Sequence, residues 1–185
     1  MLWRSIIAVL LTCFMALPTH AQEVALEDVL YMELPTGRVV IALYPDKAPT
    51  HVARIKELVR QKFYDGVVFH RVIGGFMAQT GDPEGTGMGG SGKNLKAEFN
   101  DVRHERGVVS MARAGHPDSA DSQFFIMLDT ASHLDGQYTA WGKVTEGMEH
   151  VDRIKKGDPR QNGSVTNPDK IVTLRVAADV DGKEK

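Results

Sequence analysis

A glycine-rich stretch at residues 85–94, GTGMGGSGKN, is the first candidate for chemistry in this sequence. Residues 87–94 come one residue short of a phosphate-binding P-loop, in which a buried strand leads through a glycine turn into a helix whose free N–H groups face the phosphates. Neither element is predicted, because a turn sequence precedes Gly87 and the segment after Lys93 is too short and interrupted for a good helix. Asn94 also replaces the hydroxyl that would coordinate magnesium. We therefore expect no nucleotide, and the glycines need another explanation.

Histidine, serine and acidic side chains could form two other kinds of site, a metal centre and a nucleophilic triad. The histidines beyond residue 50 are scattered, without a helical pair at four-residue spacing and without a cysteine partner, so no metal is expected. These histidines are His51, His70, His104, His116, His133 and His150. Ser119 and Ser122 lie near His116 and Asp118, but a triad is assembled from distant segments. We interpret this group as polar loop residues.

The composition is that of an ordinary soluble domain. The 185 residues are 42% hydrophobic and 25% charged, which suffices for one domain with a sizeable core. The formal net charge is −2, and no run of Lys and Arg forms the basic stripe that nucleic acid would need. No nucleic-acid partner is expected. A monomer is expected, because no heptad repeat or long exposed apolar edge is legible.

Residues 1–21 have the layout of a secretory signal peptide. Arg4 gives a short positive segment, and residues 6–17 are nearly all apolar. This apolar run is shorter than the roughly 20 residues of a membrane-spanning helix, so cleavage after Ala21 is favoured over a retained anchor. Cys13 is the only cysteine, and the mature chain 22–185 would contain no disulfide. Export of this kind fits a bacterial periplasm best, with an organelle lumen as the alternative.

Hydrophobic spacing and segments of β-branched and aromatic residues separated by turns predict two helices and eight strands. Pro49 begins an amphipathic helix that extends to Val59, and a short second helix covers residues 148–154. The predicted strands are 29–34, 38–44, 67–73, 76–79, 107–112, 123–128, 139–144 and 171–176, the first two forming a hairpin. Many short strands with two helices indicate a β-rich barrel or sandwich. Residues 81–104 lack periodicity and are predicted to form a surface loop, and loops of this length are often functional.

Several motifs occur together and in order along the chain. They are FHRVIGGFMAQ at 69–79, GDP at 81–83, GTG at 85–87, SMA at 110–112, SQFFI at 122–126 and LDG at 134–136. With them the chain resembles the cyclophilin-type peptidyl-prolyl cis-trans isomerases over residues 28–178, within a single domain 22–185. The resemblance implies a closed eight-stranded antiparallel β-barrel capped by two α-helices, in agreement with the strand count. It also accounts for the glycine-rich loop and implies no nucleotide or other cofactor.

The resemblance implies catalysis without covalent chemistry. Rotation about an X–Pro bond meets a barrier of about 18–20 kcal/mol because the nitrogen lone pair is delocalised into the carbonyl. In the twisted state the prolyl nitrogen can accept a hydrogen bond, and by resemblance Arg71 donates it, while Gln79 positions the substrate and Phe125 lines the proline pocket. Strand alternation sends Phe124 and Phe125 to opposite faces, and Phe125 is chosen because it matches the motif. The other matched substrate-binding positions are Phe76, Met77, Ala112, Arg113 and Leu134.

Two substrate-site positions depart from the family pattern. His133 stands where well-known eukaryotic members carry a tryptophan, and Tyr138 stands where they carry a histidine. That tryptophan donates its indole N–H to cyclosporin in the family, so weak cyclosporin binding is expected here. The predicted function is isomerisation of X–Pro bonds in proline-containing peptides and unfolded exported proteins. The alternative is a proline-peptide-binding module or holdase without useful turnover, and the intact Arg71 and Gln79 favour the enzyme.

Overall fold

The computed structural model describes residues 25–181 of the chain. The predicted signal peptide and its cleavage site lie outside these residues. Among the helices of the described part, none combines the length and apolar character needed to cross a membrane.

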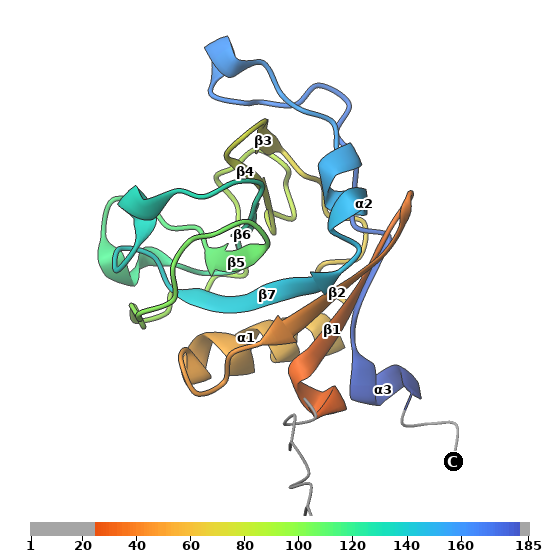
Figure 1. Ribbon diagram of the computed structural model, residues 1–185, viewed down its shortest axis with the longest axis vertical. Helices are drawn as coiled ribbons and strands as arrows, with labels where there is room; N and C mark the ends of the chain where they lie inside the picture. The colour runs from red at the N-terminus through yellow and green to blue at the C-terminus, as the bar shows by residue number, and fades with distance from the viewer. Residues whose placement is uncertain (1–24, 182–185) are drawn as a thin grey trace, which may run out of the picture.

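Eight antiparallel strands form one sheet that curls around the core (Figure 1). The strands are β1 (Val29–Leu34), β2 (Gly37–Leu43), β3 (Arg71–Ile73), β4 (Met77–Thr80), β5 (Val108–Met111), β6 (Phe124–Met127), β7 (Ala140–Glu146) and β8 (Thr173–Val176). Their order across the sheet is β3-β4-β6-β5-β7-β2-β1-β8. Each predicted strand is present, and β1 and β2 form the predicted hairpin. Strand β3 is shorter than predicted, because residues 67–70 form scattered backbone hydrogen bonds and one isolated bridge at Val68 but no continuous ladder.

The sheet is an open, curled half-barrel, so the prediction of a closed barrel is wrong. Its edge strands β3 and β8 do not pair with each other. Instead the chain that approaches β8 touches the β3 edge at separate points, through a bridge between Val68 and Lys170 and a 2.8 Å hydrogen bond from Val72 N to Gly163 O. Between these points Pro168 has no N–H to donate, and Asn167 has a left-handed φ of 51°, so the contacts do not merge into a continuous ladder.

Both predicted helices are present, as α1 (Pro49–Arg60) and α2 (Met148–Arg153), and a third, α3 (Ala177–Asp181), was not predicted. Four short 3-10 turns complete the described elements: η1 (Leu26–Asp28), η2 (Pro117–Ser119), η3 (Ser132–Leu134) and η4 (Pro159–Gln161). Helix α1 lies against one side of the sheet (Figure 1) and buries Val52, Ile55 and Leu58 at helical spacing. These side chains join the main core, where the rings of Phe124 and Trp141 meet edge to face at 5.4 Å.

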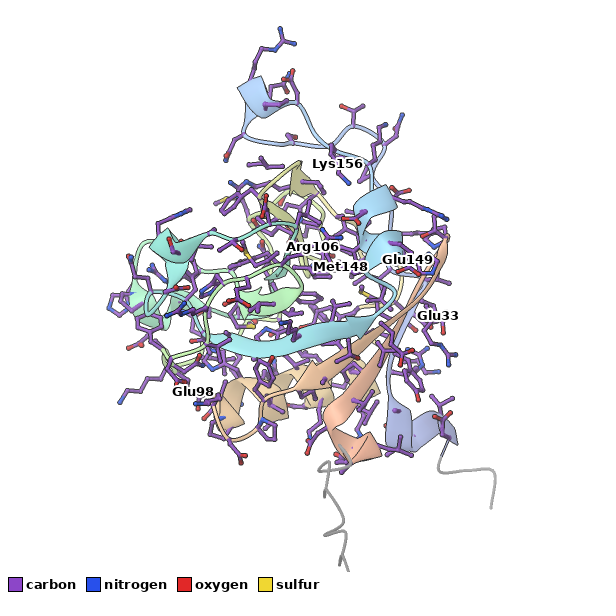
Figure 2. The ribbon with its side chains drawn as sticks, in the orientation of Figure 1. Glu33, Glu98, Arg106, Met148, Glu149 and Lys156 are labelled. Atoms are coloured by element: carbon purple, nitrogen blue, oxygen red, sulfur yellow. The ribbon has the colours of Figure 1, made fainter. Side chains whose placement is uncertain are left out.

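Glu98, from the long loop before β5, caps helix α1. The residue before the helix, Ala48, has no side chain that can accept a hydrogen bond. The Glu98 carboxylate accepts these hydrogen bonds instead, from the backbone N–H groups of Thr50 and His51 at 3.0 Å each, and it lies 2.6 Å from the His51 ring Nδ1. Figure 2 places Glu98 beside one end of α1. The cap ties the loop to the helix, because the first N–H groups of a helix have no partner within it.

Candidate active site

Nine of the ten predicted site residues line one pocket of about 90 Å³. They are Arg71, Phe76, Met77, Gln79, Ala112, Arg113, Phe125, Leu134 and Tyr138. The tenth, His133, is exposed and outside the lining, where its ring stacks on that of Phe76 at 5.8 Å between centroids. The predicted residues therefore form the pocket, except His133, which contacts the lining residue Phe76 from outside.

Strand register brings the three predicted catalytic residues together. Arg71 on β3 lies directly opposite Gln79 on β4, and Gln79 lies opposite Phe125 on β6. Residues opposite each other on antiparallel strands share a face, so the three side chains form a row. Phe124, the neighbour of Phe125, points the other way into the main core, whereas Phe125 packs in a second, smaller cluster with Met77 and other pocket residues.

Three hydrogen bonds to neutral oxygens hold the guanidinium of Arg71. Its Nη1 donates to Gln79 Oε1, Nη2 to Asn162 Oδ1 and Nε to Asn162 O, each at 3.0 Å. A guanidinium carries five N–H groups, so one on Nη1 and one on Nη2 remain without an oxygen acceptor in the described part of the chain. Burial lowers the pKa of Arg71, with Tyr138 opposing this effect, but the ordinary pKa lies so high that the group stays charged.

Asn162 is a site residue that the sequence reasoning missed. It follows η4 with a left-handed φ of 55°, in a loop that projects from the body of the protein (Figure 1). The Asn162-Gly163 pair is a recognisable turn signal. Nothing in it indicates contact with a residue 91 positions earlier, however, so only the folded structure reveals this partner of Arg71.

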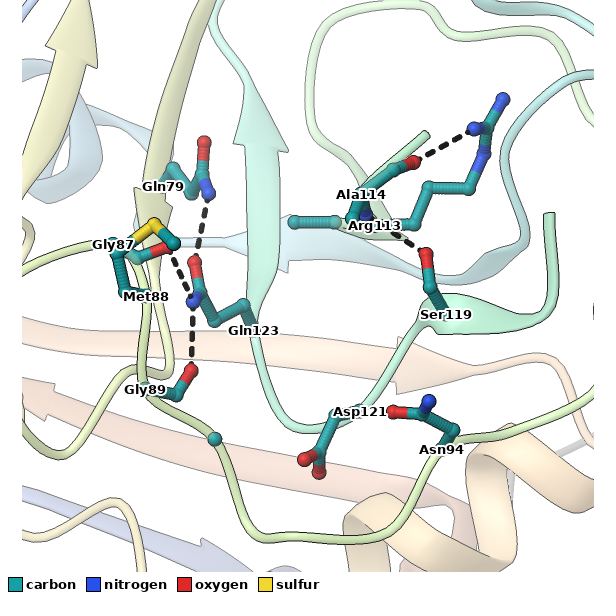
Figure 3. A pocket seen from close by; sticks show the side chains of 12 residues that line it. Gln79, Gly87, Met88, Gly89, Asn94, Arg113, Ala114, Ser119, Asp121 and Gln123 are labelled. Atoms are coloured by element: carbon teal, nitrogen blue, oxygen red, sulfur yellow. Dashed lines mark hydrogen bonds between the residues drawn. The ribbon is translucent and has the colours of Figure 1, made fainter. Parts of the chain in front are cut away.

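A relay of amide hydrogen bonds continues from Arg71 to the glycine-rich loop. Gln79 Nε2 donates to Gln123 Oε1 at 2.9 Å, and Gln123 Nε2 donates to Gly87 O at 3.1 Å and Gly89 O at 2.8 Å (Figure 3). Gln123 is a second residue absent from the predicted set. The relay links the predicted catalytic row to the backbone of the loop.

The buried carboxylate of Asp82 explains why this loop is rich in glycine. It accepts the backbone N–H groups of Glu84 at 2.8 Å, Thr86 at 2.9 Å and Gly87 at 2.5 Å. These N–H groups, which in a P-loop would face phosphate, here face a carboxylate of the same chain. Gly87 has a φ of +86°, and a Cβ at Gly89 would lie 2.1 Å from Asp82 Oδ1, so both positions favour glycine. As predicted, residues 94–100 form no helix.

A larger cleft of about 380 Å³ adjoins the pocket and shares Gln79, Ala112 and Arg113 with it (Figure 3). The glycine-rich loop, Asn94, Ala114, Ser119, Asp121 and Gln123 form its other walls. Pocket and cleft therefore lie side by side along these three shared residues, and we call the two together the groove.

Behind the pocket, a buried histidine supports the ring of Phe125. His104 Nδ1 lies 3.0 Å from Asp135 Oδ1, its Nε2 lies 3.1 Å from Ser110 Oγ, and its ring stacks on Phe125 at 6.2 Å. A carboxylate can only accept, so Nδ1 carries the proton and Nε2 accepts from Ser110 in the neutral ring. Burial lowers the pKa of His104, and Asp135 only partly offsets this. Ser110 and Asp135 belong to the SMA and LDG motifs, and this was the only indication in the sequence that they lie near the site.

The residues that resembled a triad form a local turn. Ser119 Oγ donates to His116 O at 2.6 Å, and His116 Nδ1 accepts from the backbone of Asp118 at 3.1 Å. Ser122 Oγ is buried and donates to Gly81 O at 2.7 Å. The interpretation as polar loop residues is confirmed. Within residues 25–181 no group of three or more His, Cys, Asp or Glu side chains is arranged to hold a metal ion.

Comparison with known proteins identifies the family of this chain. The family model described as cyclophilin type peptidyl-prolyl cis-trans isomerase/CLD matches residues 29–176. The chain belongs to the cyclophilin family. A probable peptidyl-prolyl cis-trans isomerase of Brucella suis is 50% identical over 165 residues, covering 83% of this chain and 84% of the relative. Peptidyl-prolyl cis-trans isomerase B of Bacillus subtilis is 46% identical over 131 residues, covering 69% of this chain and 91% of the relative.

Solved structures agree with this family. Cyclophilin AquaCyp293 from Hirschia baltica superposes with a TM-score of 0.76 at 29% identity, over 85% of this chain and 76% of that one. A cyclophilin-type isomerase of Cryptosporidium parvum, crystallised in the presence of the dipeptide Ala-Pro, gives 0.73 at 27% identity, over 80% of this chain and 98% of that one. This cyclophilin is therefore a peptidyl-prolyl cis-trans isomerase, and the predicted enzyme class is confirmed.

Proposed function

We propose that this cyclophilin isomerises X–Pro bonds through a hydrogen bond from Arg71 to the prolyl nitrogen, with the proline ring held in the 90 Å³ pocket. One observation carries the proposal: a charged guanidinium, fixed by three hydrogen bonds to oxygen, lines the pocket and keeps one N–H on Nη2 unused and one on Nη1 that meets only the weak acceptor Met77 Sδ at 4.0 Å. The planar amide offers its nitrogen no free lone pair, whereas the twisted amide does. Arg71 would therefore bind the transition state better than either ground state.

The hydrogen bond alone gives only part of the acceleration. A hydrogen bond to a charged group is worth about 1.5–3 kcal/mol, or roughly ten- to a hundredfold in rate. The pocket would contribute the rest, because Met77, Phe125 and Leu134 are almost entirely buried and leave little room for water around a bound ring. Gln79, tied to both Arg71 and Gln123, would hold the peptide carbonyl next to the rotating bond.

The substrates we propose are proline-containing segments of unfolded exported proteins. The Cryptosporidium structure with Ala-Pro supports proline peptides as the ligand class. The signal-peptide layout of residues 1–21 supports export, with a bacterial periplasm as the proposed compartment. Expression of the full chain in a Gram-negative bacterium tests this, since N-terminal sequencing of periplasmic protein should begin at Gln22. Protein that stays in the cytoplasm with Met1 would refute export.

An exchange measurement tests the mechanism. The chain from Gln22, the Arg71→Ala variant and the control Arg153→Ala, which removes an exposed arginine from α2, are each added to an Ala-Pro peptide. NMR exchange spectroscopy then reads the cis–trans rate directly. We expect strong acceleration by wild type and control and a ten- to hundredfold loss with Arg71→Ala at an unchanged unfolding temperature, on the order expected for one charged hydrogen bond. Peptide binding without acceleration would instead identify a binding module or holdase.

A further inference from the structure

Arg113 occupies the wall shared by the pocket and the cleft, and its side chain is held in place from several sides. Its guanidinium lies over the ring of Tyr138, with Cζ 4.7 Å from the centroid, and 5.9 Å from the centroid of Phe99. Nε donates to Gln137 O at 3.1 Å and Nη1 to Ala114 O at 3.0 Å. All of these partners are neutral, so the charged head is oriented without being neutralised.

The charges around the groove are unbalanced. The pocket is lined by two arginines, Arg71 and Arg113, and by no carboxylate. Within the described residues, Nη2 of Arg113 has no hydrogen-bond partner, and no carboxylate lies within ion-pair distance of this side chain. Asp121 does line the adjoining cleft, but its oxygens already accept from Ser91 Oγ and from the backbone of Gly92 and Lys93. Figure 3 shows its carboxylate well away from the Arg113 guanidinium.

We infer that Arg113 is a specificity-determining residue that favours a carboxylate side chain on the residue immediately before the proline. The inference rests on the proposed function, because a proline ring in the pocket puts the preceding residue at the boundary formed by Ala112 and Arg113. A Glu or Asp there meets a pre-oriented cation, so little side-chain entropy is lost on the protein side. Because the pair is partly exposed, the preference should be modest, about two- to fivefold in kcat/KM.

The test compares three peptides that differ only before the proline, with Glu, Gln or Lys at that position. NMR exchange spectroscopy gives kcat/KM for each with wild type, Arg113→Gln, Arg113→Glu and the control Arg153→Gln, which removes an exposed charge outside the groove. The readout is the ratio between peptides for one protein, so a general loss of activity does not enter it. The series is repeated at high ionic strength, which screens exposed pairs.

We expect wild type and Arg153→Gln to prefer Glu over Gln about two- to fivefold and to lose this preference at high salt. Arg113→Gln should bring the ratio to about one, and Arg113→Glu should reverse the order in favour of Lys. Equal rates for all three peptides with wild type, or a Glu preference that survives Arg113→Gln, would overturn the inference while leaving the proposed mechanism intact. Failure of the mechanism would differ, because Arg71→Ala would then accelerate the peptides as fast as wild type.

Discussion

Replacement of Asn162 by glycine tests whether the anchoring of Arg71 contributes to catalysis. The change deletes Oδ1, which accepts from Arg71 Nη2 at 3.0 Å, and it keeps the backbone oxygen that accepts from Nε. Glycine also adopts the φ of 55° without strain, whereas alanine would combine loss of the hydrogen bond with a backbone penalty. Asn162→Gly therefore isolates one hydrogen bond on the proposed catalytic arginine.

The expected loss is modest and falls mainly on kcat. A hydrogen bond to a charged group is worth about 1.5–3 kcal/mol, but Asn162 is exposed and water can replace its oxygen. Loss of this hydrogen bond should therefore raise the activation barrier by about 0.5–1.5 kcal/mol, which lowers the rate roughly two- to twelvefold. KM should change little, because Asn162 does not line the pocket. Asn162→Asp preserves the geometry but adds a negative charge beside Arg71, so it should cost more than the glycine variant at low salt and less at high salt.

Exchange spectroscopy on an Ala-Pro peptide over a range of peptide concentrations separates kcat from KM for both variants. Thermal unfolding serves as the control, and the unfolding temperature should move little because the altered loop projects from the body of the protein. The reasoning would be refuted if Asn162→Gly retained wild-type kcat while Arg71→Ala lost activity, since the guanidinium would then need no second anchor. A loss confined to KM would assign Asn162 to substrate binding.

Three further perturbations follow from the structure. Burial raises the pKa of Glu98, but hydrogen bonds from His51 and Thr50 outweigh it, so the pKa is lowered overall. The stabilisation of the fold by the Glu98 carboxylate is therefore complete above the ordinary pKa of 4.5 and is lost as pH falls through the lower pKa of the folded state. The difference in unfolding temperature between wild type and Glu98→Gln should accordingly shrink as the pH is lowered. Burial lowers the pKa of His104, so stability should fall as pH drops below 6.5, and His104→Gln should flatten that slope; an unchanged slope would contradict this. Wild type should bind cyclosporin weakly and His133→Trp more tightly, as measured by inhibition of exchange; nanomolar inhibition of wild type would contradict this.

Runs of β-branched and aromatic residues between turn signals were enough to predict the strands, including β5 and β6, which are buried throughout, and helical spacing was enough to predict the two longer helices. Helical spacing records which face of a helix is buried, and Val52, Ile55 and Leu58 on α1 are buried as their spacing predicts. Closure of the barrel could not be predicted in this way. It depends on whether two distant edges form a continuous ladder, and here Asn167 and Pro168 interrupt the chain that runs along the β3 edge.

The three predicted catalytic residues could be found from the sequence because they lie close together in the fold. Arg71, Gln79 and Phe125 lie on adjacent strands within short motifs, so the pattern that predicts the strands also predicts their neighbourhood. Asn162 and His104 come from segments without periodicity, and their partners are fixed by tertiary packing alone. Polar groups that orient a site residue from a loop therefore leave little trace in a single sequence.

The amide relay explains why the glycine-rich loop belongs to the same machinery as Arg71. A guanidinium can only donate, so Gln79 must turn its oxygen toward Arg71 and its NH₂ toward Gln123. Gln123 must then turn its own NH₂ toward a carbonyl, and Gly87 and Gly89 supply two. The donors of the arginine at one end and the carbonyls of the loop at the other thus fix the orientation of both amides. A residue without donors at position 71 would release only one end of the relay, because the carbonyls of Gly87 and Gly89 can only accept and would still hold the NH₂ of Gln123 toward them.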